Sequence, residues 1–144
     1  MITAKALFSQ SDWRQEWARA IRDPRELLRE LDLDPALLPG AQAAASLIPL
    51  RAPRSFVARM RRGDPDDPLL RQILPLAMEL EPAPGFVTDP LGEQAAQTAP
   101  GILHKYHGRA LLMATSACAL HCRYCFRRAF PYAQVQVGAK QWSR

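Results

Sequence analysis

The sequence of 144 residues has no long hydrophobic run and no export signal. No stretch approaches the roughly 18 consecutive apolar residues of a membrane-spanning helix. Residues 1–13 lack the basic start, apolar centre and small-residue cleavage site of a secretory leader. Since 48% of the residues are apolar, enough to build a buried core, we expect a soluble, folded protein of the cytoplasm.

Cysteine is also scarce. The chain has three cysteines, all within the eight consecutive positions from Cys118 to Cys125. Their odd number, and the tiny loops that bridges between them would close, exclude a disulfide framework. This pattern favours a reducing compartment, in agreement with the missing leader.

Positive charge exceeds negative charge, with a formal net charge of +5. Six arginines stand close together in the sequence: Arg51, Arg54, Arg59, Arg61, Arg62 and Arg71. Such a run is compatible with nucleic-acid binding. However, Asp64, Asp66 and Asp67 interrupt it, and no aromatic residues interleave for base stacking. We therefore favour a solvated helical face over a nucleic-acid partner, and an RNA-binding accessory module stays an alternative function.

Aspartate followed by proline occurs five times and is typical of helix starts. The aspartates are Asp23, Asp34, Asp64, Asp67 and Asp89. Aspartate accepts bonds from the exposed N–H groups of a first turn, and proline at the next position has the helical φ and no donor to lose. Asp23 is the clearest case, because Glu26 stands at the capping-box position. Apolar Leu27, Leu28 and Leu31 then follow at helical spacing.

Further helices are predicted from the spacing of apolar residues. One spans about 12–21 and places Trp13, Trp17 and Ile21 on a single core-facing side. A second spans 54–62, with Gly63 as its C-cap, and a shorter one spans 69–74. Phe56, Val57 and Met60 are the inward residues of the second helix. The chain up to about residue 75 should therefore be mainly helical.

A proline-rich connector and one strand follow the helical region. The prolines and glycines between Glu79 and Pro100 prevent a long regular element, and Phe86, Val87 and Leu91 should lie against a surface. The apolar run Arg109–Thr115 suits a strand buried on both faces, as in a parallel sheet. The cysteines begin three residues later, where barrel enzymes carry their active-site loops.

The cysteines form a Cys-x3-Cys-x2-Cys motif made of Cys118, Cys122 and Cys125. Three thiolates can hold a 4Fe-4S cluster and leave one iron for an outside ligand. A zinc site would need a fourth ligand from His104, His107 or His121, and no second cysteine pair exists for it. Buried thiols without a metal are a third possibility. It is disfavoured because the flanking His121, Arg123, Arg127 and Arg128 are not core residues.

The motif and its surroundings resemble the lysine 2,3-aminomutase family of radical S-adenosylmethionine enzymes. The supporting stretches are 51–56, 63–72, 84–90, 100–107 and 122–128, where the last reads Cys-Arg-Tyr-Cys-Phe-Arg-Arg. Within the family the sequence is most similar to the branch that makes (R)-β-lysine for elongation factor P. The resemblance implies an isomerase that moves an amino group from C2 to C3 of lysine by a radical mechanism. A donor such as flavodoxin or ferredoxin would supply the electron.

The resemblance also implies three cofactors and their ligands. Cys118, Cys122 and Cys125 would bind the 4Fe-4S cluster, and Tyr124 would contact S-adenosylmethionine. The remaining assignments concern the substrate and pyridoxal phosphate: Arg127 would hold the substrate carboxylate, and Lys105, Tyr106 and Arg109 would border pyridoxal phosphate.

The family fold implied by the resemblance is an α/β enzyme with a partial TIM-type barrel. Residues 1–100 would be a helical region with its connector, and residues 101–144 would hold the first barrel strand and the cluster loop. The later family motifs, including the lysine that anchors pyridoxal phosphate, do not occur in this sequence. We therefore expect a truncated chain that does not complete turnover alone.

Overall fold

The computed structural model describes residues 13–115, 117–125 and 128–129, which form two compact units. The first unit contains residues 13–80 together with Ala119–Arg123. The second contains 81–115, 117–118, 124–125 and 128–129. Residues 118–125, which carry the three cysteines and are called the cysteine segment below, are thus divided. Residues 119–123 belong to the first unit, and residues 118 and 124–125 belong to the second.

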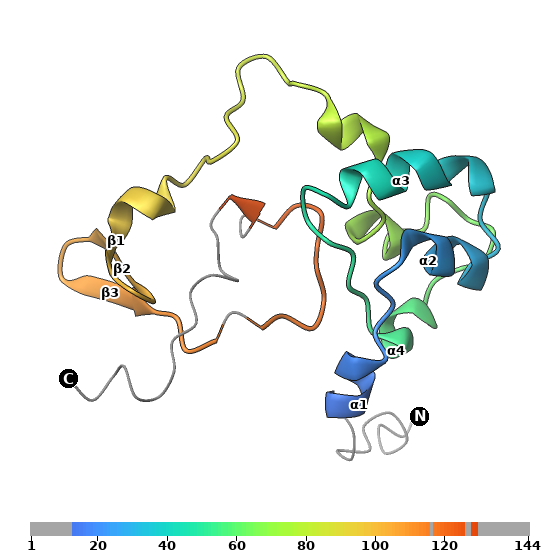
Figure 1. Ribbon diagram of the computed structural model, residues 1–144, viewed down its shortest axis with the longest axis horizontal. Helices are drawn as coiled ribbons and strands as arrows, with labels where there is room; N and C mark the ends of the chain where they lie inside the picture. The colour runs from blue at the N-terminus through green and yellow to red at the C-terminus, as the bar shows by residue number, and fades with distance from the viewer. Residues whose placement is uncertain (1–12, 116, 126–127, 130–144) are drawn as a thin grey trace, which may run out of the picture. The chain divides into compact units, whose positions relative to one another are not determined.

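Short helices build the first unit, as the ribbon in Figure 1 shows. The α-helices are α1 (Trp13–Ala18), α2 (Pro24–Glu30), α3 (Leu38–Ala44) and α4 (Arg54–Val57). The 3-10 helices are η2 (Pro35–Leu37), η3 (Leu70–Gln72) and η4 (Ala77–Leu80). None of the helices in the described ranges has the length and hydropathy to cross a membrane.

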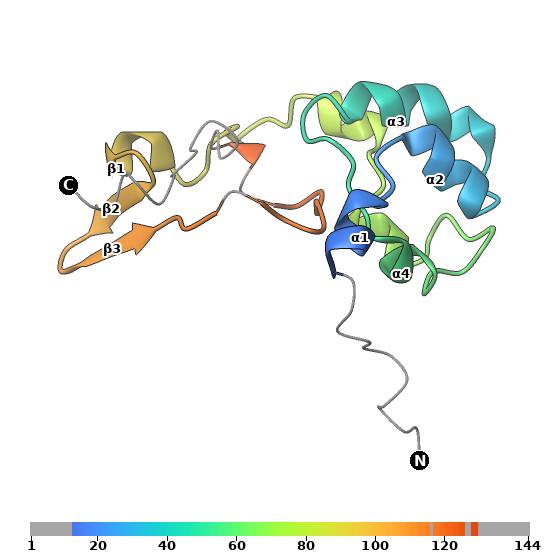
Figure 2. The same cartoon turned by 60° about the horizontal axis from the view of Figure 1, so that its bottom comes forward.

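The core of the first unit collects apolar side chains from Ile21 to Leu74. Its buried members are Ile21, Leu27, Leu28, Leu31, Leu33, Ala41, Leu50, Ala52, Val57, Met60, Leu70, Ile73 and Leu74. Helices α2 and α3 lie side by side over this core in both views (Figures 1 and 2). The leucine stripe predicted for α2 is confirmed, because Leu27, Leu28 and Leu31 are all buried.

All five Asp-Pro pairs make the same local hydrogen bond. In each, the aspartate Oδ1 accepts from the backbone N–H two residues later, at 2.8 to 3.2 Å. The prediction of a helix start is confirmed at Asp23 and Asp34, which α2 and η2 follow directly. At Asp64 and Asp89 the same bond closes a turn instead. Aspartate stabilises the turn in either case, and only the following residues decide whether a helix continues.

The helix predicted for 12–21 ends early, at Ala18. Ile21 lies instead in an extended bridge with Ala52, where each residue's N–H donates to the other's carbonyl. The capping aspartate Asp23 requires extended backbone before α2, so the chain has to leave the helix beforehand. Trp13, predicted to face the core, is 70% exposed, while Ile21 is buried as predicted.

The helix predicted for 54–62 is also shorter, because α4 ends at Val57. Beyond Val57, the backbone N–H of Arg61 donates to the carboxylate of Asp67. It therefore does not make the hydrogen bond that would continue the helix. Gly63 is therefore no helix C-cap. It adopts a left-handed conformation with φ of 69°, and its N–H donates to the carbonyl of Leu31.

Helix α3 was not predicted, and the helix predicted for 69–74 is only the single 3-10 turn η3. The sequence of α3 carries a proline and a glycine near its start, at Pro39 and Gly40. Proline is tolerated in a first turn, but Gly40 lowers the helix propensity of so short a segment, which hides the element from a reading of the sequence.

The second unit contains η5 (Glu93–Ala96) and a three-stranded antiparallel sheet in the order β1-β2-β3, visible in Figure 2. The strands are β1 (Gln97–Ala99), β2 (Ile102–Tyr106) and β3 (Arg109–Leu112). The prediction of a strand at Arg109 is confirmed, but its predicted parallel pairing and burial are wrong. Strand β3 pairs with β2 through a tight turn at His107-Gly108, and its four residues are exposed. The fold is therefore a mixture of helices and an antiparallel sheet, and the barrel stays a prediction.

The connector has no long regular element between η4 and η5, as predicted. The prediction that its apolar residues lie against a surface is wrong for two of them. Phe86 is 84% exposed and Val87 is 72% exposed, whereas Leu91 is half-buried. The boundary predicted at residue 100 stays a prediction.

A buried carboxylate organises the loop between α4 and η3. Asp67 accepts hydrogen bonds from the N–H groups of Leu69, Leu70 and Arg61, and from the Arg61 guanidinium. Burial of the carboxyl raises the pKa of Asp67, but these hydrogen bonds outweigh that effect and hold the pKa below its ordinary value of 3.8. The loop is therefore more stable when Asp67 is ionised.

We predict that acid destabilises the first unit through Asp67. Its contribution is fully present above the unfolded pKa and is lost as the pH falls through the lower folded pKa, so the free energy of unfolding should decline below about pH 4. Urea unfolding at several pH values would measure this. Asp67→Asn should be less stable at neutral pH and less sensitive to acid, whereas Asp66→Asn, at an exposed neighbour, should keep the original acid sensitivity. If the free energy of unfolding of Asp67→Asn declined with falling pH as steeply as that of the original chain, the prediction would be contradicted.

Candidate functional site

The predicted cluster ligands are three half-buried cysteines that form no disulfide. Cys122 belongs to the first unit, and Cys118 and Cys125 belong to the second. Within the part of the chain that the structure describes, no three His, Cys, Asp or Glu side chains gather into a metal-binding group, for iron or for zinc. The thiols have the chemistry that iron–sulfur clusters require, and their joint coordination of a cluster stays a prediction.

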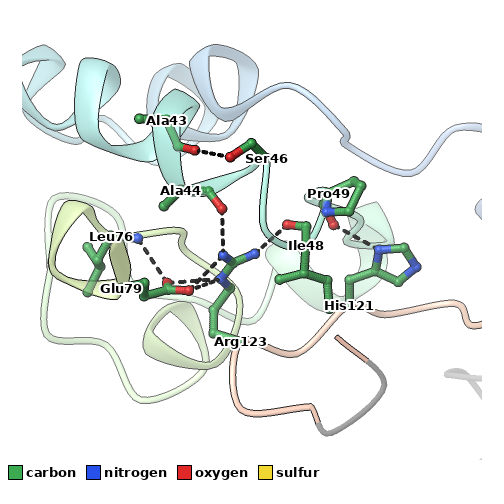
Figure 3. A network of polar contacts seen from close by, with 9 residues as sticks. All are labelled: Ala43, Ala44, Ser46, Ile48, Pro49, Leu76, Glu79, His121 and Arg123. Atoms are coloured by element: carbon green, nitrogen blue, oxygen red, sulfur yellow. Dashed lines mark hydrogen bonds and ion pairs between the residues drawn. The ribbon is translucent and has the colours of Figure 1, made fainter. Parts of the chain in front are cut away.

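A buried arginine fixes the chain next to Cys122. Arg123 is only 7% exposed and reaches between α3 and η4 (Figure 3). Its Nε and Nη2 donate to the carboxylate of Glu79, with the shortest contact, Nη2 to Oε2, at 2.7 Å. Nη1 donates to the carbonyl of Ile48 at 2.6 Å, and Nη2 also donates to the carbonyl of Ala44 at 3.0 Å. Every nitrogen of the guanidinium therefore has an acceptor.

The arrangement compensates for the burial of a charge. A guanidinium withdrawn from water is tolerated when it is paired with a carboxylate and its remaining N–H groups are bonded. Ala44 is near the end of α3, and the last carbonyls of a helix attract positive charge. Glu79 is itself held, since its Oε1 accepts from the N–H of Leu76. The pair is consequently bidentate and geometrically fixed.

A glycine brings η4 close enough to α3 for this contact. A Cβ placed on Gly40 would lie 2.9 Å from the Cβ of Ala77, which is shorter than ordinary van der Waals contact. Gly40 lies on α3, and Ala77 begins η4, the helix that carries Glu79. The absence of a side chain at Gly40 thus determines how near the Glu79 carboxylate lies to the end of α3.

Backbone and apolar contacts also attach the cysteine segment to the first unit. The N–H of Arg123 donates to the carbonyl of Gln72 at 2.8 Å, and the N–H of His121 donates to the carbonyl of Arg51 at 2.9 Å. Leu120 packs against the apolar core. Cys122 is therefore held between two residues whose backbones are both bonded to the first unit.

Sequence reasoning missed this anchor. Arg123 was predicted to lie outside the core because it is charged, and the structure shows that this is wrong. Glu79 was not singled out at all. The two residues are 44 positions apart, so no local spacing connects them. The only sign of this ion pair in the sequence is that one acidic residue, Glu79, stands within the otherwise apolar run Leu76–Leu80.

The second unit contains a cavity of about 450 Å³ beside the sheet. Its lining residues are Leu91, Glu93, Ala96, Leu103, Lys105, Tyr106, Arg109, Ala110 and Leu111. The structure thus brings together Lys105, Tyr106 and Arg109, the three residues predicted to border pyridoxal phosphate. The charged side chains of the lining are two cations, Lys105 and Arg109, and one carboxylate, Glu93, beside the Tyr106 phenol and apolar residues. This excess of one positive charge is compatible with a ligand that has an anionic group on an apolar body.

The aromatic ring of Tyr106 orders the two cations of this cavity. The Arg109 guanidinium carbon lies 5.2 Å from the ring centroid, and the Lys105 ammonium lies 5.9 Å from it. The Lys105 ammonium also donates to the carbonyl of Leu91. Their side chains come from β2 and β3, and the tight turn between the strands sets their separation.

The other predicted site residues are less informative. Tyr124 is 73% exposed in the second unit, and its predicted contact with S-adenosylmethionine stays a prediction. Arg127, predicted to hold the substrate carboxylate, lies outside the described residues.

The arginine-rich segment is balanced by acids of its own unit. Arg54 pairs with Glu26 and Glu30, and Arg62 pairs with Glu30 and Asp32. Ion pairs within the unit also engage Arg61 and Arg71. Arg51 stacks on Trp17, with 4.6 Å between the guanidinium carbon and the ring centroid. These arginines thus have partners within the unit, and the expected absence of a nucleic-acid partner stays a prediction.

Comparison with known proteins finds relatives named L-lysine 2,3-aminomutase. The L-lysine 2,3-aminomutase of Escherichia coli strain K12 is 53% identical over 136 residues, which are 93% of this chain and 39% of that protein. The protein of the same name from Haemophilus influenzae is 42% identical over 133 residues, or 92% of this chain and 39% of the relative. Over nearly its whole length the chain is therefore similar to one part of proteins named L-lysine 2,3-aminomutase.

A more distant relative has the same name. The L-lysine 2,3-aminomutase of Clostridium subterminale is 31% identical over 120 residues, or 83% of this chain and 29% of the relative. No family model matches the chain. The chain spans about two fifths of the length of the first two relatives, so the similarity covers one part of the longer aminomutases.

We predict that Glu79→Gln destabilises the first unit and loosens the cysteine segment. The substitution leaves the buried Arg123 guanidinium without a compensating charge, which typically costs about 3–5 kcal/mol. Urea unfolding would measure the stability, and limited proteolysis would detect cleavage within 119–125. Asp66→Asn is the matched control, because its carboxylate pairs with exposed Arg71 at 3.9 Å and should contribute less than about 1 kcal/mol. Equal effects of the two substitutions would refute the anchoring role.

Proposed function

We propose that this chain is part of a radical S-adenosylmethionine lysine 2,3-aminomutase that converts (S)-α-lysine into (R)-β-lysine. The observation that carries the proposal is the 53% identity to a protein named L-lysine 2,3-aminomutase across 93% of the chain. The three thiols within eight residues, and the cavity lined by Lys105 and Arg109, support the proposal. The reaction class is an isomerisation, in which an amino group moves within one molecule.

The cysteines would hold a 4Fe-4S cluster through three of its irons. When bound, such a cluster would supply the single electron that cleaves S-adenosylmethionine. The contribution of this chain is to hold Cys122 at a fixed place, because its two neighbours in the sequence, His121 and Arg123, are hydrogen-bonded to other residues of the first unit. Tyr124, which is exposed beside it, would cover the adenine of S-adenosylmethionine.

The cavity at the sheet would receive the phosphate of pyridoxal phosphate. That cofactor supplies a conjugated ring on which a neighbouring radical is stabilised. The Arg109 guanidinium would bind two phosphate oxygens as a fork, and the Lys105 ammonium would add a single charged contact. Leu103 and Leu111 would contact the apolar part and exclude water. Arg127 would bind the carboxylate of lysine.

The partners and the place of this reaction belong to the same proposal. We place the enzyme in the cytoplasm, where thiols stay reduced. Its electron donor would be a flavodoxin or a ferredoxin, and its product would serve the modification of elongation factor P. The similarity of the quoted motifs to that branch of the family supports the last point.

We predict that the purified chain takes up a cluster when it is reconstituted with iron and sulfide without oxygen. Iron and sulfide analysis should give about four of each per chain. Replacing Cys118, Cys122 or Cys125 by serine should remove most of the bound iron, because the chain has no other cysteine. His104→Asn is a control and should leave the iron content unchanged. One bound zinc and no sulfide would contradict the proposal in favour of a zinc-binding interaction module.

A second prediction concerns the phosphate-binding cavity. Isothermal titration should show that pyridoxamine phosphate, which lacks the reactive aldehyde, binds more tightly than pyridoxamine. Arg109→Ala and Lys105→Ala should each weaken that binding about tenfold or more, because each removes a charge-assisted hydrogen bond. Arg71→Ala, an exposed arginine of the first unit, is the control. If pyridoxamine and its phosphate bind equally, the cavity is not a phosphate site.

A further inference from the structure

A second residue of the cysteine segment, His121, makes two hydrogen bonds to one short stretch of the first unit. Its ring Nδ1 lies 2.8 Å from the carbonyl oxygen of Pro49 (Figure 3). Its backbone N–H donates to the carbonyl of Arg51 at 2.9 Å. Side chain and backbone thus bond to acceptors two residues apart, and His121 immediately precedes Cys122.

The acceptor stretch, residues 48–52, is buried at alternate positions, as expected for extended backbone. Ile48, Leu50 and Ala52 are 8%, 2% and 0% exposed, while Pro49 and Arg51 are more accessible. In extended backbone, carbonyls two residues apart point to the same side and the intervening residues point to the other. The carbonyls of Pro49 and Arg51 therefore form one edge, which His121 occupies.

The opposite edge of this stretch is held by a different segment. Ala52 and Ile21 exchange two backbone hydrogen bonds, at 2.8 and 3.0 Å. The Arg51 side chain stacks on Trp17 of α1. Ile21 and Trp17 thus hold residues 51–52, while the carbonyl of Ile48 accepts from Nη1 of Arg123, so the cysteine segment contacts this stretch at three carbonyls.

The contact also determines the tautomer of the imidazole. A carbonyl oxygen only accepts hydrogen bonds, so the proton has to be on Nδ1 of His121. A ring held in this way has a defined orientation. The bond is separate from the Arg123–Glu79 pair, which lies on the other side of Cys122 in the sequence.

We propose that His121 is a positioning residue for Cys122, acting through its Nδ1–H bond to the carbonyl of Pro49. Together with Arg123 it restrains the peptide on both sides of the thiol, so that the Cys122 sulfur is presented to the metal in one orientation. The role of Cys122 as a cluster ligand rests on the proposed function, whereas the placement of its backbone can be tested without any metal.

The first test uses the metal-free chain. Nitrogen-15 NMR of labelled histidine should show a protonated Nδ1 for His121, identified by its loss in His121→Ala. In His121→Ala, amide hydrogen exchange within 119–123 should become about twofold to tenfold faster, as expected for one lost hydrogen bond. His121→Asn should exchange like the original chain, because its amide nitrogen can replace Nδ1–H. His104→Ala, at an exposed position of β2, is the control.

The second test measures bound iron and sulfide after anaerobic reconstitution. The content should fall in His121→Ala and recover in His121→Asn. If the original chain binds no iron, the cluster proposal fails, and the exchange comparison alone still decides whether His121 places Cys122. An Nε2–H tautomer, or equal exchange rates in His121→Ala and the original chain, would overturn the positioning role.

Discussion

The buried ion pair between Arg123 and Glu79 is the interaction on which the placement of Cys122 in the first unit depends. It joins the cysteine segment to η4, and its remaining donors bind carbonyls at the end of α3 and just beyond it. A charge this deeply buried has few alternative positions, because each one would leave the guanidinium unsatisfied. The pair therefore fixes the position of the chain next to Cys122 more strictly than apolar packing of a similar size would.

Several features of the first unit support the contact between Arg123 and Glu79. Gly40 lets η4 approach α3, and the apolar core from Ile21 to Leu74 holds those helices in place. The extended stretch 48–52 lies against the same segment and supplies acceptors to His121 and Arg123. A helical unit of this kind serves the chemistry indirectly, by holding one of the three predicted cluster ligands, while the cationic cavity of the second unit is built on a separate sheet.

The sequence predicts what depends on neighbouring residues. Asp23 capping α2, the buried leucines of that helix and the motif of Cys118, Cys122 and Cys125 are all local patterns. The gathering of Lys105 and Arg109 at one cavity followed from the family resemblance. The missed features depend on distant partners: Ile21 leaves its expected helix to pair with Ala52, and Arg123 is buried only because Glu79 meets it. The antiparallel pairing of β3 was missed because a short apolar run does not show which partner it will have.

The most direct test of this account is a double-mutant cycle between Arg123 and Glu79. The free energy of unfolding would be measured in urea for the original chain, for Arg123→Met, for Glu79→Met and for the double variant. A buried, bidentate pair predicts a coupling energy of about 2 kcal/mol or more, with the double variant more stable than the sum of the single losses implies. A coupling near zero would contradict the claim that this pair holds the cysteine segment on the helical unit.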